Sequence, residues 1–238
     1  MADLHGCARW SPLDALDAVV DDVLDGQPDL ILLPGDFLTE RIPGGRPESM
    51  DRIASTLARL RAPLGVFASL GNHDYKDCSV AQANGYRESG VGPALEAVGI
   101  PDLSNRAVDL GSAWLVGADS QQGIGNSKVP DPRHDLDAAM EDVPEGASVI
   151  LMAHEPDIFL EHDYLIALQV SGHLHGGQIA FGNWRPVSPS RYGSTLARGV
   201  VSLGERRLMT TVGLGYTALP IRFGAPPEWN MVRIASSE

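Results

Sequence analysis

Side chains that can bind a metal ion gather in five short segments of this chain. The segments contain Asp3 and His5, Asp36, Asn72 with His73 and Asp74, His154, and His173 with His175. Of the seven histidines, only His134 and His162 lie outside them. Carboxylates, imidazoles and an amide oxygen without a thiolate favour Mn²⁺, Fe²⁺/³⁺ or Zn²⁺. Such a set exceeds the needs of one tetrahedral ion, whereas two ions about 3.5 to 4 Å apart that share a carboxylate suit displacement at phosphorus.

Each segment alone has a simpler explanation. Asp36 could be an ordinary turn residue, and Asn72 is of a type common in turns. His154 could end a strand in a hydrogen-bonded bend, and a His-x-His pair such as 173–175 in a glycine-rich loop is by itself a weak motif. The simpler explanations together require five coincidences in one chain, so we favour a shared metal site.

Apolar runs precede most of these polar segments. Short runs followed by a polar motif are typical of buried strands with functional groups in the loops at their ends. We predict four such strands, at 29–33, 64–70, 148–153 and 164–170. We predict a hairpin of 107–110 with 114–118, and further short strands at 178–181, 199–203, 207–212 and 229–234.

Helical spacing of apolar residues separates the strands. We predict helices at 11–26, around Ile53, Leu57 and Leu60, at 93–98 and near 135–142. Residues 78–92 are expected to form an exposed excursion, and 119–132 a loop. The loop at 39–47 and the 78–92 excursion follow predicted metal-bearing strands, so we expect them to shape the substrate pocket.

Length and composition limit the classes of protein. No linker interrupts the chain, so we expect one domain over residues 1–238. Its 18 Lys and Arg against 31 Asp and Glu give a formal charge of −13, which argues against a stable complex with nucleic acid. Cys7 and Cys78 are expected to be free thiols. No apolar run has transmembrane length and no signal peptide is visible, so a cytoplasmic or membrane-peripheral location is expected.

Five blocks of residues resemble, in order and spacing, the signature motifs of the calcineurin-like metallophosphoesterases. They are Asp3-Leu4-His5, Gly35-Asp36, Gly71-Asn72-His73-Asp74, His154 and Gly172-His173-Leu174-His175. Four later stretches look like those of a bacterial branch of the family: Gly176-Gly177-Gln178-Ile179, Gly213-Leu214-Gly215, Pro220-Ile221-Arg222-Phe223 and Pro227-Glu228. Members of that branch hydrolyse phosphodiesters, and some relatives cleave the pyrophosphate of UDP-diacylglucosamine. The resemblance implies an α/β (α+β) fold, a four-layer α-β-β-α sandwich of two mixed sheets flanked by helices.

The resemblance also implies roles for single residues. One divalent ion would be held by Asp3, His5, Asp36 and His175, and a second by Asp36, Asn72, His154 and His173. A hydroxide between the ions would attack phosphorus. His73 would face the leaving group as the catalytic residue, with Asp74 orienting its ring.

The expected activity is therefore hydrolysis of phosphodiester or pyrophosphate bonds in a small-molecule or lipid-linked phosphate ester. Two alternatives stay open: a phosphomonoesterase, and a catalytically silent metal-binding scaffold. Arg222 could reach a substrate phosphate or make a structural salt bridge, and the sequence does not decide between them.

The chain departs from the family at its start. Relatives have a buried strand before the first Asp-x-His, but only Met1 and Ala2 precede Asp3 here. The first strand is thus expected to be missing or truncated, either because the natural start lies upstream or because a longer protein was shortened. Asp3 and His5 should then lie in an irregular segment and bind one of the two ions more weakly.

Overall fold

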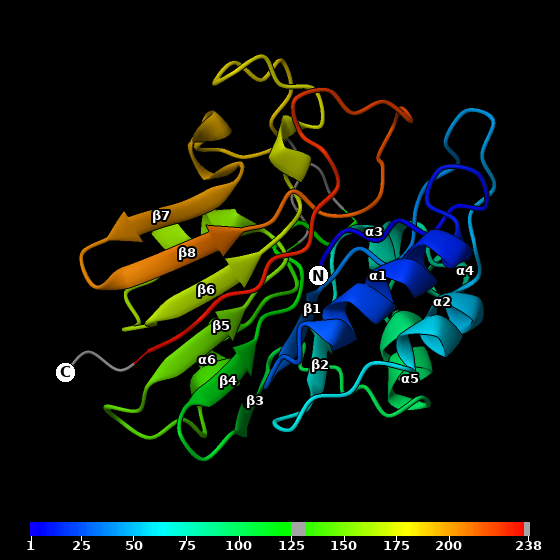
Figure 1. Cartoon of the computed structure of the whole chain (residues 1–238). Helices are drawn as coiled ribbons and strands as arrows, with labels where there is room; N and C mark the ends of the chain where they lie inside the picture. The colour runs from blue at the N-terminus through cyan, green and yellow to red at the C-terminus, as the bar shows by residue number, and fades with distance from the viewer. Residues whose placement is uncertain (125–131, 236–238) are drawn as a thin grey trace.

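Helices and two β-sheets form four layers in the computed structural model, which describes residues 1–124 and 132–235 (Figure 1). The smaller sheet is a parallel pair of β1 (Ile31–Pro34) and β2 (Val66–Ser69). The helices beside it, at the right of Figure 1, are α1 (Leu13–Asp25), α2 (Met50–Leu57), α3 (His73–Lys76), α4 (Ser79–Ala83) and α5 (Val91–Glu96).

The larger sheet has six strands in the order β3-β4-β5-β6-β8-β7. Its outer pairs β3-β4 and β8-β7 are antiparallel, and its inner pairs are parallel. The strands are β3 (Arg106–Asp109), β4 (Trp114–Gly117), β5 (Val149–Met152), β6 (Leu168–Ser171), β7 (Gly199–Leu203) and β8 (Arg206–Thr210). The remaining elements are α6 (Leu136–Met140) and three 3-10 turns, η1 (Pro156–Leu160), η2 (His175–Gly177) and η3 (Gly193–Leu196).

Alternation along the strands fills the spaces between the layers. On β5, Val149 and Leu151 pack toward α6 and η1, whereas Ile150 and Met152 join the core between the two sheets. On β2, Phe67 enters that same inter-sheet core, and Ala68 packs toward the helices. A strand buried on both faces must be apolar throughout, which is why these strands are continuous apolar runs in the sequence. The predicted four-layer fold class is confirmed, with the mixed strand directions located in the larger sheet.

Several local predictions need correction. Residues 78–92 are not a wholly exposed excursion, because they include α4 and bury Cys78, Ala81 and Val91. The strand predicted at 164–170 begins only at Leu168, and Leu165 is 86% exposed. Residues 178–181 form isolated bridges rather than a strand, and 229–234 form no strand. Half of the loop predicted at 119–132, residues 125–131, lies outside the described residues.

Several other local predictions agree with the structure. The 107–110 and 114–118 hairpin is present as β3 and β4, and the helices at 11–26, 93–98 and 135–142 appear with shifted or shorter bounds. Cys7 and Cys78 are free, buried thiols. None of the described helices is both long and apolar enough to cross a membrane.

Candidate metal centre

Loops from both sheets and the segment of residues 1–6 bring the candidate ligands to one place. Donor atoms form three overlapping groups, each within 4.8 Å: Asp3, His5 and His175; His5, Asp36 and His73; and Asp36, His154 and His173. Asn72 lies beside them at the start of α3, and its neighbour His73 donates its backbone N–H to Asp36 Oδ1 at 2.9 Å. Residues as distant in the chain as His5 and His175, 170 positions apart, therefore meet in one buried cluster.

Distances between donor atoms match those of ligands around a common cation. His154 Nε2 and Asp36 Oδ2 are 3.0 Å apart, and the Nε2 atoms of His5 and His175 are 3.1 Å apart. Asp3 Oδ1 lies 3.5 Å from His175 Nε2. Two atoms bound to one ion at about 2.1 Å are separated by about 3.0 Å at a right angle and about 3.4 Å at the tetrahedral angle.

Three buried polar atoms in the cluster have no hydrogen-bond partner among the described residues. They are Asp3 Oδ2, Asn72 Oδ1 and His154 Nε2. His154 Nε2 is close to the Asp36 carboxylate but outside hydrogen-bonding geometry, so proximity alone does not satisfy it. Because an unpaired buried polar group is costly, orphaned atoms that converge on one spot indicate that a cation is their natural partner. The residues present fit divalent metal ions.

Backbone carbonyls fix two of the imidazoles. His5 Nδ1 is 2.8 Å from the carbonyl oxygen of Leu38, and His154 Nδ1 is 2.7 Å from that of Pro34. A carbonyl can only accept, so each Nδ1 carries the hydrogen and each Nε2 presents its lone pair to the cluster. Both rings are thus held in the tautomer that binds metal.

The loops that carry the ligands have strained backbones. Asp3, His5, Asp36, His173 and His175 all have positive φ, between 42° and 70°. This left-handed region is uncommon for residues other than glycine, and strain of this kind concentrates at functional sites.

Two glycines make room for the carboxylates. A Cβ at Gly71 would overlap Asp36 Oδ1, and a Cβ at Gly172 would overlap Asp3 Oδ2. The glycine in each motif is therefore required by the close approach of a carboxylate from a different segment.

Asp74 does not orient His73, contrary to the prediction. Its carboxylate accepts the backbone N–H groups of Asp36, Phe37, Leu38 and Gly71 at 2.8 to 3.2 Å, so it fastens the Asp36 loop to the Asn72 loop. The ring is held by Asp77 instead, whose Oδ2 lies 2.5 Å from His73 Nδ1. Asp77 is four residues after His73, which is about one helical turn. This spacing is the only signal in the sequence for a contact between Asp77 and the His73 ring.

The pKa values of the clustered side chains are shifted because these groups are buried and lie close to one another. Burial raises the pKa of Asp3 to about 7, and the Asp36 carboxylate contributes to the rise. Burial also lowers the pKa of His5 to about 3, and His73 adds to that effect. Burial opposes ionisation of Asp36 too, but His154 and His73 outweigh it and hold its pKa well below the usual value. A cation would favour ionised carboxylates and neutral imidazoles together.

The pKa of His73 is raised. Burial acts against its charged form, but the carboxylates of Asp36 and Asp77 outweigh burial. His73 is therefore suited to hold a proton next to the ligand cluster.

Residues that support the site from outside the motifs were not identified from the sequence. Glu155 is buried and accepts Ser120 Oγ at 2.6 Å and the Gln121 N–H at 2.8 Å. It thereby holds the turn that brings Gln122 Nε2 to 3.0 Å from His173 Nε2. Gln122 therefore contacts one ring nitrogen of the candidate ligand His173.

Arg222 has a structural role. Its guanidinium donates to the carbonyl oxygens of Gly215 and Ala225 at 2.9 and 3.1 Å, and its Nη2 lies 3.1 Å from His175 Nδ1. The side chain thus ties the C-terminal loops to the Nδ1 side of the His175 ring.

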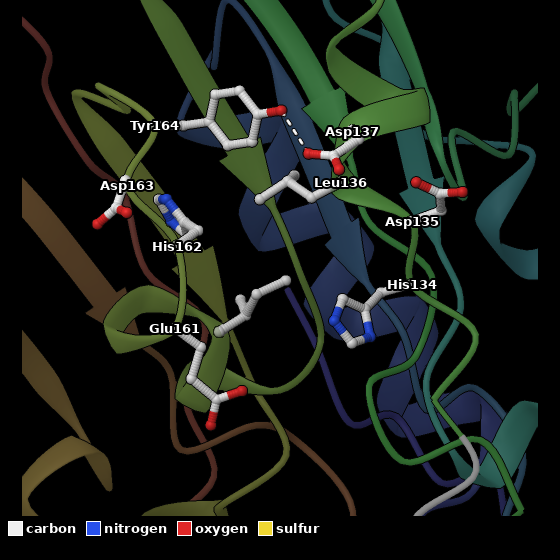
Figure 2. A pocket seen from close by; sticks show the side chains of 9 residues that line it. His134, Asp135, Leu136, Asp137, Glu161, His162, Asp163 and Tyr164 are labelled. Carbon is white, nitrogen blue, oxygen red and sulfur yellow. Dashed lines mark hydrogen bonds between the residues drawn. The ribbon is translucent and has the colours of Figure 1, made fainter.

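The two histidines outside the motifs belong to a different place. His134 and His162 line a cavity of about 690 Å³ between α6 and the loop after η1, on opposite sides of it in Figure 2. Tyr164 Oη donates to Asp137 Oδ1 at 2.6 Å across one wall. None of the candidate metal ligands lines this cavity.

Comparison with known proteins agrees with the geometry. Residues 1–177 match the family model of the calcineurin-like phosphoesterases. The chain is 29% identical over 240 residues to the uncharacterized metallophosphoesterase YkuE of Bacillus subtilis, covering 99% of this chain and 78% of that one. It is 27% identical over 243 residues to the phosphodiesterase YaeI of Escherichia coli, covering 98% and 80%.

A relative from Helicobacter pylori, also an uncharacterized metallophosphoesterase, is 28% identical over 228 residues, and the match spans 93% of this chain but 55% of that longer protein. The family model covers every residue of the predicted ligand cluster, from Asp3 to His175. The chain therefore belongs to the calcineurin-like phosphoesterases and is a metal-dependent hydrolase of phosphate esters.

Proposed function

We propose that this protein is a phosphodiesterase with a dinuclear metal centre, acting on phosphodiester or pyrophosphate bonds of a small or lipid-linked molecule. The observation that carries the proposal is the position of Asp36, whose carboxylate belongs to two of the three donor groups and lies between the two sets of histidines. One carboxylate shared by two sets is the arrangement that a pair of ions requires.

Each ion would have its own ligands in addition to Asp36. The first ion would be held by Asp3, His5 and His175, and the second by Asn72, His154 and His173. When bound, the two cations would supply the positive charge that activates water and stabilises the phosphoryl oxygens. Mn²⁺, Fe²⁺ and Zn²⁺ all suit this mixture of ligands.

His73 is the residue we assign to proton transfer. Its Nδ1 is engaged by Asp77, so its Nε2 is the atom that can donate a proton to the leaving oxygen. Its ring stands edge-on to that of His5, with centroids 4.8 Å apart, so it borders the first ion's ligands. The distances alone also allow His73 as a ligand with His5 and Asp36, and we favour the proton role because the two ions have full ligand sets without it.

Replacement of His73 tests this function. In Mn²⁺-loaded enzyme, His73→Ala should lower turnover of bis-p-nitrophenyl phosphate by about 10²- to 10⁴-fold while the metal content stays unchanged. His134→Ala is the matched control, because His134 lies in the separate cavity. Equal turnover in His73→Ala and His134→Ala would contradict the role of His73, and loss of metal would make it a ligand.

The choice between diester and monoester substrates is tested by the same protein. The phosphodiesterase named among the relatives supports a diester. We expect a higher kcat/KM for bis-p-nitrophenyl phosphate than for p-nitrophenyl phosphate. The reverse order would identify a phosphomonoesterase, and no turnover of either by the metal-loaded protein would favour a silent scaffold.

A further inference from the structure

Three aromatic rings form an exposed cluster beside the metal centre. Phe181, Trp184 and Phe223 are 53%, 63% and 56% exposed. The ring centroids of Phe181 and Trp184 are 5.6 Å apart, and those of Phe181 and Phe223 are 4.8 Å apart. Single exposed apolar residues are ordinary, but three large rings in contact with one another and with solvent indicate an interaction surface.

Backbone hydrogen bonds hold the cluster in place. Ala180 N donates to the Phe223 carbonyl at 2.7 Å, and Phe223 N donates to that of Gln178 at 2.9 Å. Phe181 N donates to the Trp184 carbonyl at 2.9 Å. The two loops that carry the rings, residues 178–187 and 216–225, project together at the upper edge of Figure 1. Further apolar residues on these loops are exposed by 49% to 69%: Val187, Leu219 and Ile221.

A hollow of about 590 Å³ with two arginines adjoins the rings. Arg185 and Arg198 line it together with Asn183, Ser194 and Thr195, and no carboxylate is among its described lining residues. Arg185 donates to the carbonyls of Gly176 and Asn183, and Arg198 to that of Gly224. In a chain with a formal charge of −13, this is a local site of positive charge, and its hydroxyl and amide groups suit a phosphate.

We propose that the ring cluster and the arginine hollow bind the surface of a membrane that contains anionic phospholipid. Aromatic rings settle at the boundary between head groups and acyl chains, and each nearby arginine adds attraction to anionic lipid. The apolar rings and the arginines lie side by side, so the rings can enter the boundary of the acyl chains while the arginines contact anionic head groups.

Docking in this way would bring phosphate head groups to the metal centre. Arg185 Nε donates to the Gly176 carbonyl at 2.9 Å, and Gly176 directly follows the candidate ligand His175. The surface and the ligand loop are thus parts of one connected segment. Membrane binding requires no turnover, so it can be present or absent independently of the proposed phosphodiesterase activity.

Flotation with vesicles tests the proposal. The whole 238-residue chain should float with vesicles of phosphatidylcholine and phosphatidylglycerol in equal parts, and bind less to pure phosphatidylcholine or at high salt. The triple variant Phe181→Ser, Trp184→Ser, Phe223→Ser should lower the bound fraction about tenfold or more, and Arg198→Gln about fivefold.

The matched control replaces apolar residues that are equally exposed elsewhere. Leu165 and Val200 are 86% and 66% exposed and lie outside both loops. Leu165→Ser with Val200→Ser should float like the wild type. Circular dichroism and the thermal midpoint of every variant would show whether it is folded. A folded triple variant that floats as well as the wild type would overturn the proposal.

Brominated phosphatidylcholine in the same vesicles gives a second measurement. Bromine quenches tryptophan fluorescence only when the indole ring enters the bilayer boundary. Vesicles should therefore quench the wild type, and Trp184→Phe should reduce that quenching. Three outcomes reject the proposal: no flotation of the wild type, binding of inorganic phosphate at the arginines without vesicle binding, or a concentration-dependent dimer that the triple variant abolishes. Turnover of soluble bis-p-nitrophenyl phosphate, measured without vesicles, decides the phosphodiesterase proposal separately.

Discussion

The segments of residues 1–6 and 71–77 deliver ligands to the same centre in different ways. The 71–77 segment follows β2 and contains α3, so regular structure holds the candidate ligand Asn72 on both sides. The 1–6 segment is not a strand. Its residues Asp3, His5 and Gly6 donate to the carbonyls of Gly35, Asp36 and Phe37 at 3.0 to 3.1 Å, and Gly215 donates back to Asp3 at 2.7 Å.

The difference shows that a ligand residue can be positioned by hydrogen bonds to other loops as well as by the strand or helix next to it in the chain. Asp3 and His5 are fully buried, although both have positive φ and neither follows a strand. The prediction of an irregular segment is therefore confirmed. The weaker binding of the first ion stays a prediction, now with a physical basis: the strain in this segment must be offset by hydrogen bonds to two other loops.

The largest effect is expected at the residue that both regions share. Asp36→Ala should remove a ligand from both ions, lower the bound metal to less than one equivalent and reduce turnover by about 10³-fold or more. Asp25→Ala, at the exposed end of α1, is the control. Metal analysis and bis-p-nitrophenyl phosphate turnover check this, and full metal content in Asp36→Ala would refute the shared carboxylate.

Asp74→Asn should mainly affect stability. An asparagine offers only one acceptor oxygen, and its NH₂ group would face backbone N–H groups that now donate to Asp74. Buried donors left without acceptors should cost about 2 to 4 kcal/mol in the free energy of unfolding. Urea unfolding of the metal-free protein measures it, and a change below about 0.5 kcal/mol would show that this carboxylate does not fasten the loops.

Gly172→Ala and Gly71→Ala separate the two regions. The new methyl at residue 172 would press on Asp3 and should weaken only the first ion, by about tenfold in affinity, which corresponds to about 1.4 kcal/mol. The methyl at residue 71 would press on Asp36 and should weaken both ions. Calorimetric Mn²⁺ titration distinguishes the outcomes; identical titration curves for the two variants would mean that the ions do not have separate ligands.

The smallest effect is expected from Asp77→Asn. Asp77 positions the His73 ring and raises its pKa, so the variant should lose about tenfold in kcat with normal metal content. Because removal of a carboxylate lowers the pKa of the adjacent imidazolium, the alkaline limb of the pH–rate profile should move to lower pH. An unshifted profile would limit Asp77 to a structural role.

The sequence predicts best those parts of the fold whose residue types are compatible with only one kind of surroundings, such as burial on both faces of a strand. Strands such as β5 are buried on both faces and must be apolar, and the loops after them carry the ligands. Residues 229–234 have similar apolar residues but no partner strand. Trp229 instead packs against α1 and donates to Asp22 Oδ2 at 2.7 Å, which depends on tertiary contact alone.

The site shows the same division. The candidate ligands lie in short local motifs, which a sequence can indicate without the fold. Asp74 and Asp77 have the same side chain within one loop, and only the folded positions of Asp36 and His73 decide which carboxylate holds the backbone and which holds the ring. Glu155 and Gln122 were missed because their partners are more than 30 residues away in the chain.

Calorimetric titration of the metal-free protein with Mn²⁺, compared with His5→Ala and His154→Ala, distinguishes a pair of ions from a single one. We expect two equivalents in the wild type, with the weaker one lost in His5→Ala and the tighter one lost in His154→Ala. A single equivalent of bound Mn²⁺ in the wild type would contradict a pair of ions joined by Asp36. Loss of the same equivalent in both variants would contradict it as well.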